Sequence, residues 1–156
     1  MGPGGKEPGL VYEFSYNAQL KPPVAFGPGH NGTRFYVEVT EGRVEGERLS
    51  GRLSGGGDWL LAGADGWGRL DVRTHITADD GAAVYVCYGG ILELNDAVMA
   101  AVTAGGATDF GEQYFRTAPV FETGDPNYAW LTQNVFLGMG HFLGGGVIEY
   151  DVYRVT

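Results

Sequence analysis

One segment of the sequence carries three chemically active side-chain types in a single row. Residues 69–77 alternate apolar and polar side chains as a β-strand does, and the alternation puts Asp71, Arg73 and His75 on the polar face. Asp71 supplies a carboxylate, Arg73 a fixed cation and His75 a base that titrates near neutral pH. We expect this face to line a polar cavity, with Asp71 and His75 as catalytic groups and Arg73 as a substrate-binding group. The alternative is that the same face is turned to water.

The turn after this strand decides which side chains join the row. The Asp-Asp-Gly sequence at residues 79–81 suits a three-residue hairpin loop that is closed by a glycine in the left-handed conformation. That loop sets His75 opposite Tyr85, so the Tyr85 phenol would share the face and become a third catalytic candidate. A four-residue loop would shift the register by one, turn Tyr85 to the other face and bring Tyr88 near Asp71 instead. Both registers remain open at this point.

A second polar and aromatic group lies on two strand-like segments near the C-terminus. Alternation places Arg116 and Glu122 on one face of the first segment, and Trp130 and Asn134 on one face of the second. An arginine, an indole and an amide facing one space would form an amphipathic small-molecule pocket. We expect Arg116, Trp130 and Asn134 to bind substrate. The alternative is a structural Arg116–Glu122 neighbourhood and a core tryptophan.

Asp58 is a further substrate-binding candidate, because it follows three consecutive glycines at the expected start of a strand. That position suits the rim of a pocket, and it equally suits a strand cap. Cys87, the single cysteine, is interpreted as a small core residue rather than a nucleophile.

The sequence carries no motif for a metal or a nucleotide. His30, His75 and His141 do not pair at a ligand spacing such as His-x-His, and Cys87 has no cysteine partner; a site built from His75 and Asp71 would need tertiary structure to complete it. Residues 27–32 match the letters of G-x-G-x-x-G, but a strand-like run follows them instead of the helix that a dinucleotide fingerprint requires. We therefore expect no metal and no cofactor.

The composition of the chain limits the classes of partner that it is expected to bind. A formal net charge of −9 repels phosphate backbones, which argues against a nucleic-acid partner. No apolar run approaches the roughly 18 residues of a membrane span, and the N-terminus lacks the pattern of a signal peptide. One cysteine permits no internal disulfide and fits a reducing compartment. We expect a cytoplasmic protein without a membrane partner that binds a small-molecule ligand or substrate; the sequence is compatible with a homodimer.

Short strands separated by glycine turns dominate the 156 residues, of which 28 are Gly and 20 are aromatic (3 Trp, 9 Tyr and 8 Phe). Strand-like runs are expected at 10–20, 34–40, 43–53 (as one or two short strands), 58–62, 69–77, 83–88, 114–123, 130–138 and 147–155. One helix is expected at 95–104, because Asn95 can cap its start and Gly105 its end. These elements predict an all-β fold, a lipocalin- or avidin-like closed antiparallel barrel of eight to ten strands with one short helix. We expect a single domain over residues 10–156 and a disordered tail at residues 1–9.

Several stretches resemble the DUF3237 (UPF0311) family. The resemblance runs from about residue 10 to the C-terminus; it implies a compact β-barrel and no particular activity. Asp71 and Arg73 fall within the family pattern, which favours the inward orientation of their face. The stretches are residues 57–60 (GDWL), 68–73 (GRLDVR), 79–86 (DDGAAVYV), 114–124 (YFRTAPVFETG) and 128–138 (YAWLTQNVFLG).

Three functions are compatible with such a barrel, and the state of its cavity separates them. The first is a cofactor-independent enzyme that performs isomerase, cyclase or lyase-type proton transfer on an aromatic or polyketide-like compound. The second is a non-catalytic carrier or sensor of small molecules, which needs an open aromatic cavity but no titratable group. The third is a structural protein whose barrel is filled by side chains. We favour the enzyme.

Overall fold

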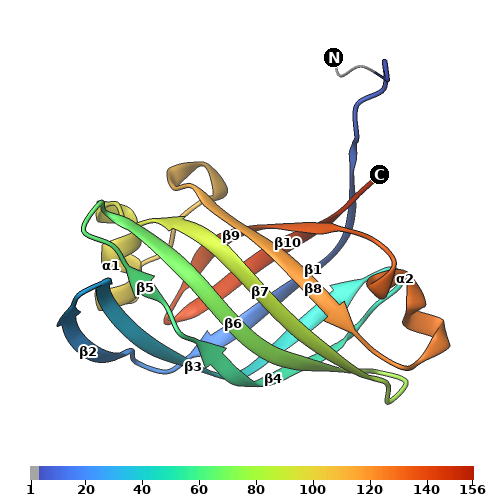
Figure 1. Ribbon diagram of the computed structural model, residues 1–156. Coiled ribbons are helices and arrows are strands. Elements are labelled where there is room, and N and C mark those ends of the chain that lie inside the picture. Colours follow the sequence, from blue (N-terminus) through green and yellow to red (C-terminus); the bar gives the residue numbers. More distant parts are fainter. Residues whose placement is uncertain (1–3) are drawn as a thin grey trace.

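A computed structural model describes residues 4–156, which form ten β-strands and four short helical segments (Figure 1). The helical segments are α1 (Asp96–Ala104), the 3₁₀ turn η1 (Phe110–Glu112), the 3₁₀ turn η2 (Pro126–Tyr128) and α2 (Ala129–Thr132). Of the predicted tail, residues 1–3 lie outside the described residues, and residues 4–9 contain no helix or strand. The strands are β1 (Leu10–Leu20), β2 (Val24–Gly29), β3 (Gly32–Gly46), β4 (Gly51–Asp58), β5 (Leu61–Ala62), β6 (Trp67–Ala78), β7 (Ala83–Glu93), β8 (Phe115–Glu122), β9 (Phe136–Gly144) and β10 (Val147–Val155).

The strands pair into one antiparallel sheet whose two ends meet. Neighbouring strands follow the order β1-β10-β9-β8-β7-β6-β4-β3, and β1 also pairs with β3, which closes the circuit. β2 extends the sheet beyond β3, and the short β5 pairs with both β3 and β6. The prediction of an antiparallel β-barrel with one short helix is confirmed.

Local turn and cap chemistry agrees with the sequence at two places. In the β6–β7 hairpin, Gly81 has a φ of 94° and the Ala78 N–H donates to Ala82 O at 2.8 Å, so His75 faces Tyr85 across the ladder. This is the register of the three-residue loop. In α1, the Asn95 side chain accepts from the Val98 N–H at 3.0 Å, and the helix ends as predicted at a left-handed glycine.

Several segments differ from their predicted structure; one is β2 (Val24–Gly29), where no strand was expected. The predicted strand at 130–138 is wrong, because η2 and α2 carry the chain in helical turns as far as Thr132 and β9 begins only at Phe136. Asp125 starts these turns by accepting from the Asn127 N–H at 2.9 Å. The break expected between the runs at 34–40 and 43–53 is also wrong, since β3 continues through Gly42. A Cβ on Gly42 would lie 1.8 Å from Asn17 O, so the glycine allows β1 to approach β3 closely here.

Aromatic side chains fill one end of the barrel. The Phe14 and Phe121 rings lie 5.8 Å apart, the Phe121 and Phe136 rings 5.2 Å apart, and Trp130 on α2 packs against Phe14 at 6.5 Å. We call this the closed end; it is the end of the barrel beside α2 (Figure 1). The opposite end, beside α1 and the end of β1 at Leu20, we call the open end.

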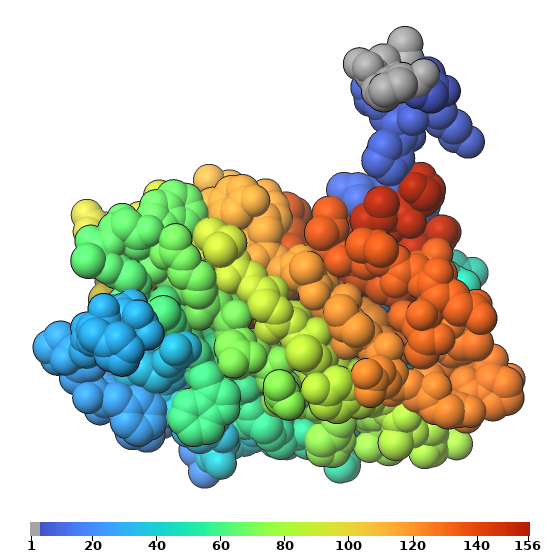
Figure 2. Space-filling model, viewed as in Figure 1, coloured from blue at the N-terminus to red at the C-terminus, as the bar shows by residue number. Residues whose placement is uncertain are grey.

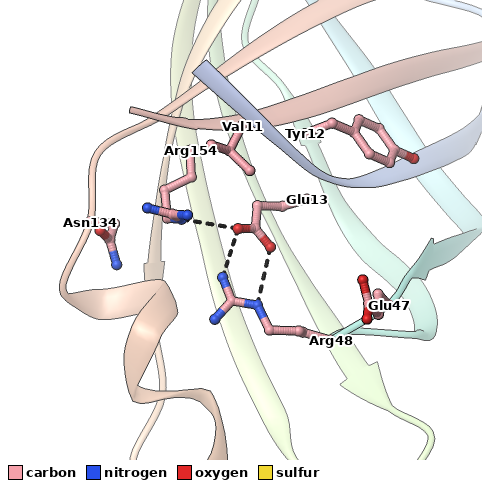
Figure 3. A pocket seen from close by; sticks show the side chains of 7 residues that line it. All are labelled: Val11, Tyr12, Glu13, Glu47, Arg48, Asn134 and Arg154. Atoms are coloured by element: carbon pink, nitrogen blue, oxygen red, sulfur yellow. Dashed lines mark hydrogen bonds and ion pairs between the residues drawn. The ribbon is translucent and has the colours of Figure 1, made fainter. Parts of the chain in front are cut away.

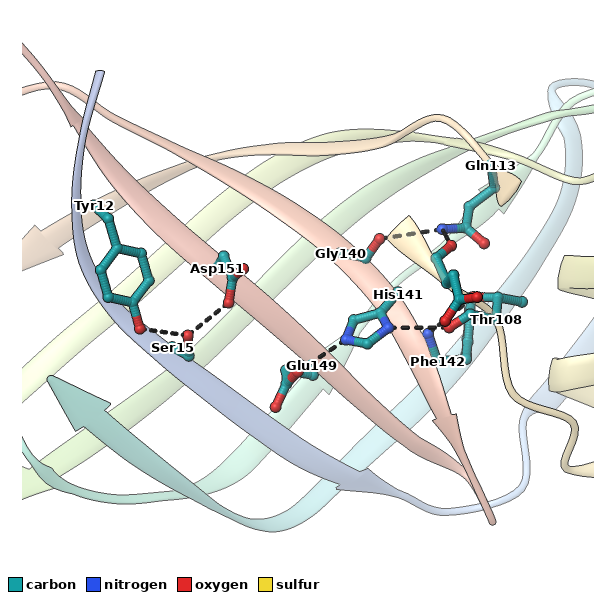
Figure 4. A network of polar contacts seen from close by, with 10 residues as sticks. Tyr12, Ser15, Thr108, Gln113, Gly140, His141, Phe142, Glu149 and Asp151 are labelled. Atoms are coloured by element: carbon teal, nitrogen blue, oxygen red, sulfur yellow. Dashed lines mark hydrogen bonds and ion pairs between the residues drawn. The ribbon is translucent and has the colours of Figure 1, made fainter. Parts of the chain in front are cut away.

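Polar side-chain pairs connect neighbouring strands on the outer wall. On β9 and β10, His141 Nε2 lies 2.8 Å from Glu149 Oε1 while its Nδ1 lies 3.0 Å from Thr108 O, and on β1 Ser15 donates to Asp151 at 2.6 Å (Figure 4). Side chains of β6, β7 and β8 form a continuous surface over another part of the wall, green to orange in Figure 2. Within residues 4–156, no helix is long and apolar enough to cross a membrane.

Candidate functional site

The open end of the barrel contains a cavity of about 760 Å³, which we call the open-end cavity. Its walls are mostly apolar, and its mouth lies among the segment that follows β1, helix α1 and the turn at residues 144–146. Apolar walls with few polar groups are typical of small-molecule sites. Wall residues on the strands include Phe35, Leu70, Val72, Leu92, Phe115 and Phe142.

Asp58 faces this cavity because of an irregularity in β4. Ser54 pairs with His75 and Gly57 pairs with Arg73, so β4 has one residue more than β6 between these pairs. Such a β-bulge reverses the alternation that follows it. Asp58 therefore lies opposite Val72, whose side chain is buried in the barrel, instead of sharing the outer face of Arg73.

Glycine makes the bulge possible. Gly55 and Gly56 have φ values of 75° and 71°, which side-chain-bearing residues rarely adopt. A Cβ on Gly56 would also lie 1.9 Å from Arg73 O. Thr74 points inward and donates to Gly55 O at 2.9 Å, which fixes the bulged backbone.

The Asp58 carboxyl group is poorly compensated for its burial. Burial raises the pKa of Asp58 to about 6; the Asp71 carboxylate also raises this pKa, while a hydrogen bond from the Asp71 N–H and the charge of Arg34 lower it. The hydrogen bond, at 2.9 Å, goes to Asp58 Oδ1. A carboxyl group that titrates close to neutral pH inside an apolar cavity can both accept and donate a proton.

Three tyrosines converge where the open-end cavity meets the filled part of the barrel. Tyr88 and Tyr150 line the cavity, and their rings meet edge to face at 5.6 Å. Tyr16 lies next to Tyr150 at a ring distance of 4.9 Å. Burial raises the pKa values of all three phenols well above 10.0, and the Asp58 carboxylate further raises those of Tyr88 and Tyr150. The three hydroxyl groups therefore stay protonated.

A second, smaller pocket of about 510 Å³ lies at the closed end and is dominated by charge. Glu13, whose side chain is 7% exposed, accepts hydrogen bonds from Arg48 at 2.6 Å and from Arg154 at 2.9 Å (Figure 3). Burial acts to raise the pKa of Glu13, but the hydrogen bonds and charges of the two arginines outweigh it and lower the pKa. Arg48 in turn lies over the Trp130 ring at 3.8 Å. This carboxylate is fully engaged in structure, so the open-end cavity is the better candidate for chemistry.

The predicted catalytic row lies outside the barrel. Asp71, Arg73 and His75 are exposed on the outer face of β6, and Tyr85 is 37% exposed on the outer face of β7. The prediction that they line a cavity is wrong, although the predicted register and the shared face of these residues are both present. The reason is that the apolar face of β6, with Leu70, Val72 and Ile76, is buried in the interior.

The structure places the predicted substrate-binding residues in different parts of the molecule. Asp58 lines the open-end cavity. Arg116 lies outside the barrel, where it donates to Phe115 O at 3.0 Å and sits 5.1 Å from the Tyr114 ring. Trp130 belongs to the core at the closed end, and Asn134 is exposed and donates to Trp130 O at 2.8 Å. The prediction that Arg116, Trp130 and Asn134 face one substrate pocket is therefore wrong, and Asn134 instead lines the charged pocket at the closed end.

The tyrosine cluster was absent from the sequence-based site. Tyr16, Tyr88 and Tyr150 stand at alternating, otherwise apolar strand positions, and their strands are far apart in sequence, so only the barrel brings them together. The glycine triplet before Asp58 was a usable signal, since consecutive glycines within a strand mark a bulge. Across residues 4–156, no group of three or more His, Cys, Asp and Glu side chains is arranged to hold a metal ion.

The sequence matches a family model over residues 8–155, and the family is described as "Protein of unknown function (DUF3237)". The chain belongs to the DUF3237 family. A UPF0311 protein of Clostridium acetobutylicum is 34% identical over 134 residues, which cover 85% of each chain.

Solved structures agree with the architecture. A crystal structure of a beta-barrel like protein from Acinetobacter baumannii has a TM-score of 0.83 at 28% identity and covers 99% of this DUF3237 chain and 100% of its own. A crystal structure described as that of an enzyme from Penicillium herquei has a TM-score of 0.72 at 21% identity and covers 100% of both chains. At that identity the second likeness concerns the fold.

Proposed function

We propose that this DUF3237 protein is an enzyme that transfers protons within a small molecule bound in the open-end cavity and needs no cofactor to do so. The reaction class is isomerase, cyclase or lyase-type chemistry, and the substrate is aromatic or polyketide-like. The observation that carries the proposal is Asp58, a carboxyl group aimed by a glycine bulge into an apolar cavity where burial raises its pKa to about 6.

Asp58 would act first as a base and then as an acid. Its carboxylate removes a proton from a carbon or hydroxyl group of the substrate, and the electron pair left behind moves into the substrate's conjugated system. The protonated Asp58 then returns the proton to another atom of the same molecule. A catalytic pKa near the working pH suits both steps, since the group is present in both forms.

The cavity would supply orientation. Apolar walls hold a flat, conjugated substrate by exclusion of water, and they also weaken the competition of water for the proton. The likeness to the Penicillium herquei enzyme supports the proposal only so far as the fold is compatible with catalysis, because one fold can host many functions.

The test uses solvent deuterium and an enolisable bicyclic ketone, 2-tetralone. Proton NMR in D₂O would follow loss of the hydrogens next to the carbonyl, with wild type, Asp58→Asn and the outer-wall control Asp151→Asn, which is not among the groups that shift the pKa of Asp58. We expect wild type and Asp151→Asn to exchange these hydrogens faster than buffer alone, and Asp58→Asn to fall to the buffer rate. Equal rates in wild type and buffer would refute the proposed chemistry.

The carrier alternative is supported by the same apolar lining, and binding separates it from the enzyme. If 2-tetralone quenches tryptophan fluorescence in a saturable manner while exchange stays at the buffer rate, the cavity binds ligands without catalysing proton transfer. Saturable binding together with exchange that depends on Asp58 supports the enzyme.

A further inference from the structure

The rings of Tyr16, Tyr88 and Tyr150 lie together beside the open-end cavity, 4.9 Å apart for Tyr16 and Tyr150 and 5.6 Å apart for Tyr88 and Tyr150. Each phenol carries one proton that it can donate. Even a chain of two hydrogen bonds through the three hydroxyls would use only two of these protons, so one O–H would remain free to donate.

The protein offers this cluster little else. Within the described residues, the Tyr16 hydroxyl is buried and has no hydrogen-bond partner. Buried hydroxyls are normally satisfied, and an exception beside a cavity calls for an acceptor from outside the protein. The charged groups among the cavity-lining residues are Asp58 and Lys21, and Lys21 is at the mouth in an ion pair with Glu38.

We infer that the three tyrosines form an oxyanion site at the floor of the open-end cavity, which binds an enolate or phenolate oxygen. Tyr88 and Tyr150 would touch this oxygen, since both line the cavity, and Tyr16 would be a positioning residue behind them. The ligand class follows from this geometry: a phenol, an enol or an enolisable ketone, with its oxygen on the tyrosines and its acidic hydrogen toward Asp58. The inference rests on the proposed function in so far as a ligand must bind in this cavity, but it does not require that the protein catalyse a reaction.

The position of Asp58 gives the site a specific behaviour. Its carboxylate interacts with Tyr88 and Tyr150, so an ionised Asp58 disfavours an anionic ligand beside them. Once Asp58 has taken a proton from the substrate, the same place carries no negative charge. Asp58→Asn reproduces that second state, so this variant should bind a phenolate more tightly than wild type.

The experiment measures binding of two ligands. The first is 4-nitrophenol, whose ionised form absorbs at a longer wavelength than its neutral form. The second is 4-nitrotoluene, which has a similar shape but carries a methyl group in place of the phenolic hydroxyl. In Asp58→Asn at pH 7.5 we expect the bound nitrophenol to be ionised, with at least about a tenfold gain in affinity over wild type. Adding Tyr88→Phe or Tyr150→Phe to that variant should remove most of this gain and change 4-nitrotoluene binding less than about twofold. Tyr16→Phe should give a smaller, selective loss of about threefold.

Matched controls keep the outcomes separable. Tyr114→Phe removes an exposed phenol outside the barrel and should alter neither ligand's affinity. If the Tyr→Phe changes weaken both ligands alike, or neither, or if the bound nitrophenol stays neutral, the oxyanion site is refuted. If Tyr88→Phe does not fold, Tyr150→Phe and the absorbance of the ligand bound to Asp58→Asn decide. A failed exchange assay with selective phenolate binding would refute the enzyme and keep the site.

Discussion

The two ends of the barrel each hold a carboxyl group with little exposure to water, and they treat it in opposite ways. At the closed end Glu13 receives hydrogen bonds from two arginines, which hold its pKa below the usual 4.5. At the open end Asp58 receives one backbone N–H, and burial raises its pKa from 3.8 to about 6. The two pKa values shift in opposite directions because two arginines donate hydrogen bonds to Glu13, whereas the hydrogen bond to Asp58 comes from a neutral backbone N–H.

The comparison teaches where chemistry can occur in this fold. A carboxylate locked by two guanidinium groups is held in one protonation state and one position, which suits closing a barrel end. A carboxylate that receives no hydrogen bond from a cation and faces an apolar cavity is less stable as an anion, and it can gain and lose a proton near neutral pH. We therefore regard the closed end as structural and the open end as functional.

The largest stability effect should come from the bulge that aims Asp58. Gly56→Ala combines a left-handed backbone with a Cβ 1.9 Å from Arg73 O, and we expect a loss of about 3 kcal/mol or more in the free energy of unfolding. Gly55→Ala is the matched control: its φ is 75°, but the nearest atom is 3.4 Å away on the His75 side chain, and strain alone costs about 1 kcal/mol. Urea unfolding measures both, and equal losses would remove the special role of Gly56.

The next largest effect concerns the closed end. Glu13→Gln leaves Arg48 and Arg154 without their carboxylate, and because both arginines keep contact with water we expect a loss of about 2 kcal/mol at pH 7.5, less than for a fully buried pair. Glu47→Gln, which changes a residue that lines the same pocket, should stay within about 0.5 kcal/mol. A Glu13→Gln loss as small as that of Glu47→Gln would show that the arginines do not stabilise this end.

The pH dependence of stability should separate the two carboxyl groups by sign. Asp58, with a folded pKa of about 6 against 3.8, takes up a proton on folding between these values, so its contribution is most favourable below 3.8 and is lost as the pH rises through 6. Glu13 has the opposite shift, so its contribution is present above 4.5 and is lost as the pH falls.

Asp58→Asn should therefore have a larger free energy of unfolding than wild type at pH 7.5, by roughly 1–2 kcal/mol in urea titrations, and the gain should disappear as the pH falls below 3.8. The penalty of Glu13→Gln should instead shrink as the pH falls below 4.5. Parallel pH profiles for the two variants would contradict the contrast between the ends.

The smallest effect is expected on the outer wall. Arg73→Ala and His75→Ala replace exposed side chains on β6, so each should change the free energy of unfolding by no more than about 0.5 kcal/mol and leave 2-tetralone exchange unchanged. A clear loss of exchange in either variant would return the outer row to the candidate site and weaken the case for the open end.

Local features of this fold could be predicted from the sequence because they depend on near neighbours. The β6–β7 register follows from a glycine at the third loop position, and helix α1 follows from Asn95 and Gly105 at its ends. Strand alternation correctly separated the two faces of β6. It could not tell which face is inside, and the inward orientation that the family resemblance favoured was wrong.

The site itself depends on distant neighbours. Asp58 faces the cavity only because of an extra residue in β4, and a one-residue count of this kind is invisible to a pattern that treats strands one at a time. Tyr16, Tyr88 and Tyr150 come from β1, β7 and β10 and meet only in the closed barrel. In the sequence each has the pattern of an ordinary core residue.

The central claim is that Asp58, alone of these two carboxyl groups, titrates near neutral pH in the folded protein. Carbon-detected NMR of the side-chain carboxyl carbons, followed from pH 3 to pH 8 and assigned with Asp58→Asn and Glu13→Gln, measures both in one sample. We expect the Asp58 resonance to shift with a midpoint of about 6 and the Glu13 resonance with a midpoint below 4.5. A midpoint near 3.8 for Asp58 would show that the cavity does not perturb this carboxyl group, and it would contradict the account.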